Sequence, residues 1–235
     1  MDERTDAIAL YARSCGFSIR DRTVIVEGNT DVELFELAAR LEHEATGLVL
    51  LGDGLAVCSP GTGDRGGTRG VIRELTVLRG FSRIHLLPNG RPRYRFIGLF
   101  DNDKAGRQAV TYARDSDTSV LEYKDVFRLH PVMPVTGNLD PKALQTAFER
   151  ENAAYKGKDW ELEDVLSNNF VETFLSEQPN ALVRVLPVGN GRVHRDFTAE
   201  GKALLHRYAR ENAMREDLAG VIEVLKALRF YCGLK

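Results

Sequence analysis

The chain has 235 residues, enough for one hydrophobic core with a smaller appendage. Its hydrophobic content of 43% and charged content of 28% are typical of a globular protein and exclude a disordered one. The net charge of −2 excludes a surface coated with basic residues, so any contact with nucleic acid has to come from a local patch.

Targeting and cysteine signals favour a cytoplasmic protein. No apolar run approaches the roughly 20 residues that a membrane span needs. The charged residues 1–6 are not followed by the apolar segment of a signal peptide. The three cysteines lie far apart without a C-x-x-C pair, which argues against a disulfide framework or a zinc site. We therefore expect a cytoplasmic location and no membrane contact.

The first informative stretch is a strand that ends in acidic residues. Residues 2–15 predict a short helix, and the β-branched run at 23–26 predicts a strand. Glu27 follows this strand in an E-G-x-x-D sequence that ends at Asp31. Asp31 falls in the first turn of the next helix, where an acid complements the helix dipole. Glu27 lacks such an explanation, because a glutamate at the end of a buried strand neither caps a helix nor favours a strand.

The next segments predict a helix, a second strand and a glycine-rich loop. Thr30 and Glu33 predict a capping box for a helix that runs to about residue 44. Short apolar runs at 48–51 and 55–58 predict a second strand, interrupted by a turn or a bulge. The G-x-G-x-x-G sequence at 61–66 is not a dinucleotide fingerprint, because a proline separates it from the strand and no acidic residue follows about twenty positions later.

The most informative stretch is Asp101-Asn102-Asp103. An apolar run at 82–87 predicts a third strand, and the run at 95–100 predicts a buried strand that leads directly into the two acids. As residues i and i+2 of an extended segment, Asp101 and Asp103 face the same side. Two such carboxylates repel each other unless a divalent cation lies between them or one is protonated. Alternatively, Asp103 is only the N-cap of the next helix and Asp101 a solvated strand end.

The order of elements predicts the fold class. Strands and helices alternate as far as a last strand at 126–129, which predicts an α/β fold with a mainly parallel central sheet flanked by helices. The second half predicts a helix at 141–155, a helix or short strand at 159–166, and a long helix at 198–229 that is broken near residues 211–212. We see no linker.

We therefore expect a single domain over residues 1–235. It consists of a core at about 20–135 and a helical C-terminal extension at about 136–235.

The two acidic strand ends resemble those of the Toprim domain. Glu27-Gly28 after the first strand and Asp101-x-Asp103-x-Ala105-Gly106 after a later one match the pattern of this family. Topoisomerases of types IA and II, bacterial primases, recombination mediators, 5S ribosomal RNA maturases and OLD-family nucleases share this domain. The acid four residues after the glutamate, Asp31, resembles the OLD-type, primase and maturase branches. The chain is too small for the strand-passage machinery of a topoisomerase.

The OLD-type resemblance extends to two further positions. OLD-type nucleases carry a later acidic motif that helps to bind a second metal, and residues 160–166 resemble it. Glu163 is the best candidate, with Glu161 and Asp164 as alternatives; a solvated acidic helix start is the structural explanation. These enzymes also use a lysine in their C-terminal portion, which implies Lys202 unless that residue is an ordinary surface lysine.

The resemblance implies a metal-dependent nuclease with two Mg²⁺ or Mn²⁺ ions about 4 Å apart. The implied metal ligands are all carboxylates: Glu27, Asp31, Asp101, Asp103 and Glu163. Glu27 is either a ligand or the general base, and Lys202 stabilises the charge that develops on the phosphorane. The five histidines are scattered without metal-ligand spacing, so we expect none of them to bind metal.

Four arginines are the expected contacts to the nucleic-acid backbone: Arg91, Arg93, Arg192 and Arg195. Solvated loop and helix faces explain any one of them equally well. The chain carries no P-loop, so the resemblance implies either a free-standing nuclease or an effector that a separate regulatory ATPase controls, for example in anti-phage defence. A homo-oligomer stays open.

Three other functions stay open from the sequence. The first is a catalytically inactive Toprim module that binds nucleic acid or a partner, as recombination mediators do. The second is an enzyme similar to the ribosomal RNA maturases. The third is a phosphatase-like enzyme with Asp101 as nucleophile, although haloacid dehalogenase-type enzymes place their D-x-D after the first strand.

Overall fold

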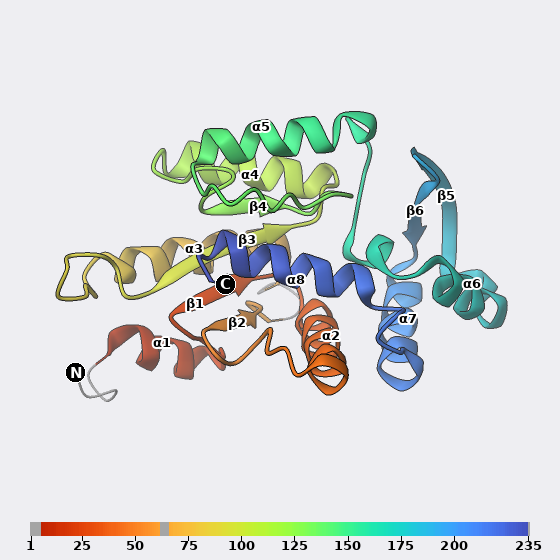
Figure 1. Cartoon of the computed structure of the whole chain (residues 1–235), viewed down its shortest axis with the longest axis horizontal. Coiled ribbons are helices and arrows are strands. Elements are labelled where there is room, and N and C mark those ends of the chain that lie inside the picture. Colours follow the sequence, from red (N-terminus) through yellow and green to blue (C-terminus); the bar gives the residue numbers. More distant parts are fainter. Residues whose placement is uncertain (1–5, 62–65, 235) are drawn as a thin grey trace.

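The computed structural model describes residues 6–61 and 66–234, and a four-stranded parallel sheet forms its centre (Figure 1). The strands are β1 (Arg22–Ile25), β2 (Leu55–Cys58), β3 (Arg95–Phe100) and β4 (Val126–Arg128). They lie in the order β2-β1-β3-β4, and each neighbouring pair is parallel. The predicted α/β class with a mainly parallel sheet is confirmed, and the arrangement is consistent with a Toprim-like fold.

Helices cover both faces of this sheet, because alternate strand residues point to opposite sides. Ile97 of β3 packs in one apolar cluster with residues of α2 (Asn29–Thr46), α5 (Pro141–Glu151) and α8 (Ala219–Tyr231). Its neighbour Phe96 packs in a second cluster. The helices that contribute to this second cluster are α1 (Ala7–Cys15), α3 (Gly67–Ser82) and α4 (Lys104–Ser116).

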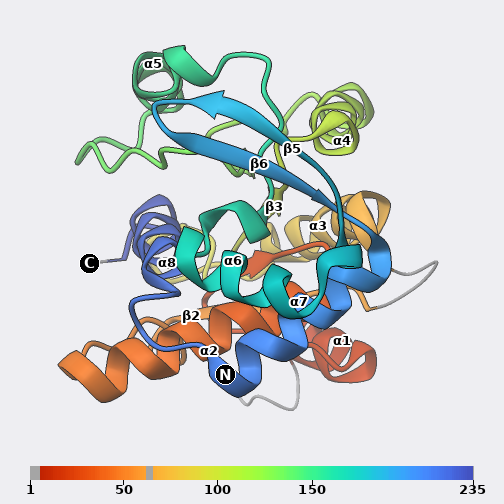
Figure 2. The same cartoon turned by 90° about the vertical axis from the view of Figure 1, so that its right-hand side faces the viewer.

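The remaining C-terminal elements lie at one end of the molecule (Figure 2). They are η3 (Ala153–Tyr155), η4 (Leu162–Val165), α6 (Asn168–Glu177), η5 (Pro179–Ala181), β5 (Leu182–Gly189), β6 (Arg192–Phe197) and α7 (Ala199–Asn212). β5 and β6 form an antiparallel hairpin of their own. The break predicted in the last helical stretch is confirmed, since α7 ends at Asn212 and α8 begins at Ala219.

The predicted second strand is confirmed at 55–58 as β2, but its first part at 48–51 and the predicted third strand at 82–87 are wrong. Residues 48–51 form no strand and lead into a turn in which the Gly52 N–H donates to the Leu55 carbonyl at 2.8 Å. At residues 82–87, α3 continues to its last residue, Ser82, and Ile84 is 72% exposed. Many side chains of both apolar runs are exposed to solvent, so neither run occupies the buried position of a central strand.

Two details of the helices and the hairpin also differ from prediction. The N-cap of α2 is Gly28, whose N–H donates to the Asp31 carboxylate at 3.0 Å, so the predicted capping box of Thr30 and Glu33 is wrong. The strand β5 at Leu182–Gly189 is not among the elements predicted from the sequence. This strand was missed because its residues 183–187 are all exposed and lack a buried alternate face.

Two of the remaining predictions concern the glycine-rich stretch and the membrane. Residues 62–65, the middle of that stretch, lie outside the described residues. Among the helices of the described part of the chain, none combines the length and apolar character needed to cross a membrane.

Candidate active site

Three acidic side chains from separate elements meet at the carboxyl edge of the sheet. β1 and β3 are neighbours, and Glu27 and Asp101 follow their carboxyl ends. The Asp101 N–H donates to Glu27 Oε1 at 3.3 Å. Glu27, Asp31 and Asp101 line one small cavity of about 10 Å³. The structure therefore brings these three predicted site residues together.

Close backbone contacts hold the two turns that carry these acids. The Glu27 carbonyl accepts the N–H of Gly67 at the start of α3, at 2.9 Å. At the other turn, a Cβ on Gly106 would lie 1.9 Å from the Asp101 carbonyl oxygen. Only glycine lets α4 start this close to the end of β3. These contacts hold the turn after β1 against the start of α3, and the turn after β3 against the start of α4.

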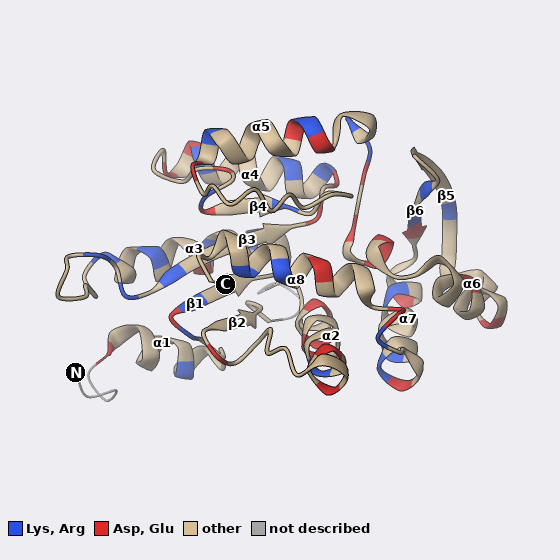
Figure 3. Ribbon diagram, in the orientation of Figure 1, with Lys and Arg blue, Asp and Glu red and all other residues tan. Residues whose placement is uncertain are grey.

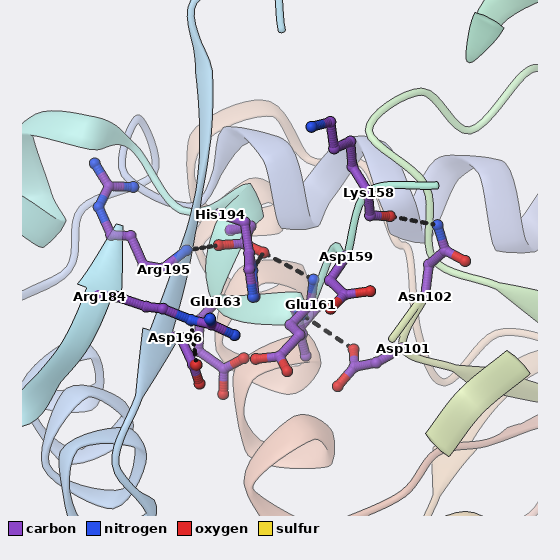
Figure 4. Close-up of polar contacts among 12 residues, drawn as sticks. Asp101, Asn102, Lys158, Asp159, Glu161, Glu163, Arg184, His194, Arg195 and Asp196 are labelled. Atoms are coloured by element: carbon purple, nitrogen blue, oxygen red, sulfur yellow. Dashed lines mark hydrogen bonds and ion pairs between the residues drawn. The ribbon is translucent and has the colours of Figure 1, made fainter. Parts of the chain in front are cut away.

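The 3₁₀ helix η4 brings two further acids to the same place. Asn102 and Trp160 exchange backbone hydrogen bonds of 2.8 and 3.3 Å, which join the segment before η4 to the end of β3. The Leu162 N–H then donates to Asp101 Oδ1 at 3.1 Å. Figure 4 shows the carboxylate of Asp101 pointing toward those of Glu161 and Glu163.

Helix α7 adds the cation that faces these acids. Lys202 Nζ lies 2.7 Å from Glu161 Oε2 and 3.5 Å from Glu163 Oε2. His206, one turn further along the same face of α7, lies 3.0 Å from Glu163 Oε1 through its Nε2 atom. Lys202 is therefore part of the cluster and not an ordinary surface lysine.

The acids at the sheet edge hold their protons unusually tightly. Burial raises the pKa of Glu27 to about 7, and neighbouring Asp31 and Asp103 add to the effect. Burial and the nearby Glu163 raise the pKa of Asp31 to about 6. Burial, Glu163 and Glu27 raise the pKa of Asp101 well above its usual value. Each cause disfavours the charged form, as expected for like charges removed from water.

Glu163 differs from these acids because Lys202 and His206 lie against its carboxylate. Burial alone would raise its pKa, but the hydrogen bond with His206 and the charge of Lys202 outweigh burial and lower the pKa to about 2. Burial would lower the pKa of Lys202, yet the charges of Glu163 and Glu161 raise it above its usual value. The site therefore has two parts. Glu163 and Lys202 keep their charges, whereas Glu27, Asp31 and Asp101 hold their protons more tightly than free carboxyl groups do.

Two acids considered from the sequence have structural roles. Asp103 caps α4, since its Oδ1 accepts the Gly106 N–H at 2.7 Å, and it does not line the small cavity. Asp164 turns toward the hairpin, where it accepts from the Arg195 N–H at 2.9 Å and lies 2.7 Å from His194 Nδ1. The N-cap explanation thus holds for Asp103, although its charge still acts on Glu27.

The four predicted nucleic-acid arginines do not form one surface. Arg91 and Arg93 precede β3, roughly 20 Å from Asp101 at the usual rise of a six-residue strand. They lie near the basic stretch that joins α3 to β3, at the opposite end of the sheet from the acids (Figure 3). Arg195 is 5% exposed. Arg192, the other arginine of β6, is partly exposed. The four arginines therefore cannot all hold one phosphate.

The donor set fits Mg²⁺ or Mn²⁺ in chemistry. Carboxylate oxygens are the ligands these hard cations prefer, and a dication would relieve the repulsion that raises the pKa values of Glu27, Asp31 and Asp101. In the described parts of the chain, no three Asp, Glu, His or Cys side chains form a group that could hold a metal ion as it stands. Lys202 instead supplies the positive charge beside Glu161 and Glu163.

The sequence analysis missed several residues that organise the site. Asn102 is 6% exposed, and its Oδ1 accepts from Arg128 at 3.0 Å. His206 was set aside with the other histidines, although its spacing of four from Lys202 places both on one helix face. The contacts of Asn102 and His194 join residues 26 and 30 positions apart, and no local pattern indicates such pairs.

No family model, curated protein or solved structure matches the chain. The evidence on function therefore comes from the residues of the site.

Proposed function

We propose that this protein is a metal-dependent nuclease that cleaves phosphodiester bonds of DNA or RNA, as the Toprim resemblance implies. The observation that carries the proposal is the meeting of acids from three elements with a lysine from a fourth. Glu27, Asp101 and Glu163 come from β1, β3 and η4, and Lys202 comes from α7. Acids with raised pKa values that meet a partly buried cation are typical of active sites.

The proposed roles follow from charge and position. Glu27, Asp31, Asp101 and Glu163 would hold Mg²⁺ or Mn²⁺, which supplies an activated water and neutralises phosphate charge when bound. In the alternative role, with the metal held by the other three acids, Glu27, whose pKa is about 7, accepts a proton from the attacking water. The Lys202 ammonium stabilises negative charge on the phosphate oxygens. The hydrogen bond from Leu162 keeps Asp101 oriented.

The test compares wild-type protein with three variants on plasmid DNA, RNA and a phosphate monoester, each with Mg²⁺ or Mn²⁺. We expect Glu27→Ala and Asp101→Asn to lower the rate of polymer cleavage at least about 100-fold, the usual contribution of a catalytic proton acceptor or of a charge-stabilising group. Glu36→Ala, at an exposed glutamate of α2, is the matched control and should cleave like wild type. Folding of each variant is checked by circular dichroism.

The outcomes separate the alternatives. A wild-type protein that binds oligonucleotides but cleaves no polymer would be an inactive binding module. Cleavage limited to structured ribosomal RNA would favour a maturase-like enzyme. Monoester turnover that survives Glu27→Ala but not Asp101→Asn would favour a phosphatase with Asp101 as nucleophile.

A further inference from the structure

A second and larger cavity lies on the other side of the segment that carries the site acids. Its volume is about 500 Å³, within the usual range for small-molecule sites. Trp160 and Asp164 line it, whereas their neighbours Glu161 and Glu163 belong to the acid cluster. The loop after β4, helix α8 and strand β6 form the other walls. A ligand in this cavity would be separated from the acids only by one stretch of backbone.

Buried polar atoms without partners surround this cavity. Trp160 is 2% exposed, and its indole Nε1 has no hydrogen-bond partner among the described residues. The same is true of His130 Nε2, and both residues line the cavity. Arg195 Nη1 is also unpartnered, and Arg195 binds the cavity residue Asn168 through its other terminal nitrogen at 2.9 Å. A buried polar atom without a partner costs about 1–3 kcal/mol, so three such atoms, two of them on residues that line the cavity, indicate a missing ligand.

One arginine supplies positive charge to the cavity. The guanidinium of Arg192 lies 5.7 Å from the ring centres of both Trp160 and Tyr155, and it donates a hydrogen bond to the Pro131 carbonyl. Arg192 is partly exposed and lines the cavity. A cation held in place by two aromatic rings is suited to a phosphate at the edge of an aromatic pocket.

The other walls suit a flat, neutral group. Val132, Val193 and Val224 are apolar lining residues. Burial, with a smaller effect of Arg128, lowers the pKa of His130 to about 4, so its ring is neutral at pH 7 and adds no charge. The two carboxylates of the cavity, Asp164 and Glu223, are paired with His194 and Lys226. The cavity therefore combines an aromatic ring, apolar walls, unpaired hydrogen-bonding atoms and a single fixed cation. These are the features that recognise an unstacked nucleobase with its phosphate.

We propose that this cavity binds a nucleobase of the substrate strand beside the phosphodiester that is cleaved, with Trp160 and His130 contacting the base and Arg192 its phosphate. This inference rests on the proposed nuclease function and adds to it that the substrate is single-stranded or locally unpaired. A base inside a duplex cannot enter the cavity without leaving the stack.

The experiment uses Trp160, the single tryptophan of the chain, as the probe. Eight-nucleotide single strands of DNA and RNA are titrated into the full-length protein in EDTA, so that no cleavage occurs. We expect a saturable change in tryptophan fluorescence and about tenfold weaker binding for Arg192→Ala. Arg184→Ala, at an arginine of β5 that pairs with Asp196 at 3.0 Å outside the cavity, is the matched control and should bind like wild type.

Two further measurements isolate the base. Binding of a fluorescein-labelled strand, followed by anisotropy, should weaken about tenfold for Trp160→Phe, which removes the indole N–H but keeps an aromatic ring. A strand in which every base is missing should bind Trp160→Phe and wild type about equally, because it lacks the group that Trp160 contacts.

Several results would overturn the inference. These are a saturating strand that leaves Trp160 fluorescence unchanged, equal loss of binding in the two arginine variants, or a free mononucleotide that binds more tightly than the strand. If Arg192→Ala cleaves the substrate with an unchanged KM, the proposed base site is wrong and the proposed nuclease function still holds. If binding depends on the bases but no strand is cleaved, the proposed nuclease function is wrong and the proposed base site still holds.

Discussion

At the scale of single residues, the site divides its carboxylates by their surroundings. Glu27 and Asp31 lie among other acids away from water, and their pKa values are raised. Glu163 is more deeply buried but meets His206 and Lys202, and its pKa is lowered. The same functional group therefore holds a proton tightly in one position and keeps its charge in another.

The raised pKa of Glu27 predicts a stability that depends on pH. Its pKa rises from 4.5 to about 7 on folding, so the folded state binds this proton more tightly than the unfolded state. This contribution is complete below pH 4.5 and is lost as the pH rises toward 7, by at most about 3 kcal/mol. In EDTA, Glu27→Gln should therefore be more stable than wild type at pH 8 and about equal at pH 4.5. Urea unfolding at both values measures this.

The control for that prediction is Glu36→Gln, at an exposed position of the same helix that Glu27 precedes. Its free energy of unfolding should match wild type at both pH values. If Glu27→Gln is less stable than wild type at pH 8, the Glu27 carboxylate is stabilising when charged and the burial argument is wrong.

The same raised pKa values predict that metal binding depends on pH. Carboxyls that hold protons near neutral pH, here Glu27, Asp31 and Asp101, must release them before they bind a cation. The affinity for Mn²⁺ should therefore rise between pH 6 and pH 8, with net release of protons. Calorimetry in two buffers of different ionisation enthalpy measures both quantities, and proton-free binding at pH 6 would contradict the prediction.

At the scale of elements, η4 is the piece that joins the sheet to the C-terminal hairpin. Its start pairs with the end of β3 through Asn102 and Trp160. Asp164 connects the helix to β6, because its carboxylate accepts the N–H groups of Arg195 and Glu161 and lies beside His194. A single buried carboxylate thus sets where Glu161 and Glu163 stand relative to Asp101.

This connection predicts a large effect for a small change at Asp164. Asp164→Asn keeps the shape of the side chain but removes its charge and one acceptor, and should lower the free energy of unfolding by about 1–3 kcal/mol. Asp196→Asn, in the same hairpin, breaks an exposed pair with Arg184 and should cost less than about 1 kcal/mol. Chemical denaturation compares the two, and equal effects would show that Asp164 is not a structural tie.

At the scale of the whole molecule, one apolar cluster spans both halves of the chain. Val24 of β1 and Ile97 of β3 belong to the same cluster as Leu205 of α7 and Leu225 of α8. Helix α8 packs on this face of the sheet, where Tyr231 stacks on Phe127 of β4 with ring centres 4.5 Å apart, and α7 packs against α2. The position of Lys202 depends on this packing as much as on its own helix.

The shared cluster predicts that the chain unfolds as one unit. Leu225 is fully buried, and Leu225→Ala should lower the free energy of unfolding by about 2–5 kcal/mol. Trp160 fluorescence, which reports on the η4 region, and far-UV circular dichroism should shift together. Leu10→Ala, at a half-exposed leucine of α1, should have a small effect. Two separate transitions would show that the C-terminal part folds independently.

The sequence by itself determined the sheet class and the acids at its edge. Buried strands have to be apolar, so the runs that became β1 and β3 were recognisable, and Glu27 and Asp101 stood out because nothing local explains them. Runs of the same kind at 48–51 and 82–87 were misread, since an apolar sequence does not state whether it will be buried.

The tertiary structure alone decided which acids meet and what charge they carry. Asp103, two residues after Asp101, is a helix cap. Glu163 and Lys202, which are 62 and 101 positions away in the sequence, act on the charge of Asp101. Local spacing governs turns and caps because they involve near neighbours. Burial and long-range charge, which set the pKa values of Glu27 and Glu163, exist only once the helices have packed on the sheet.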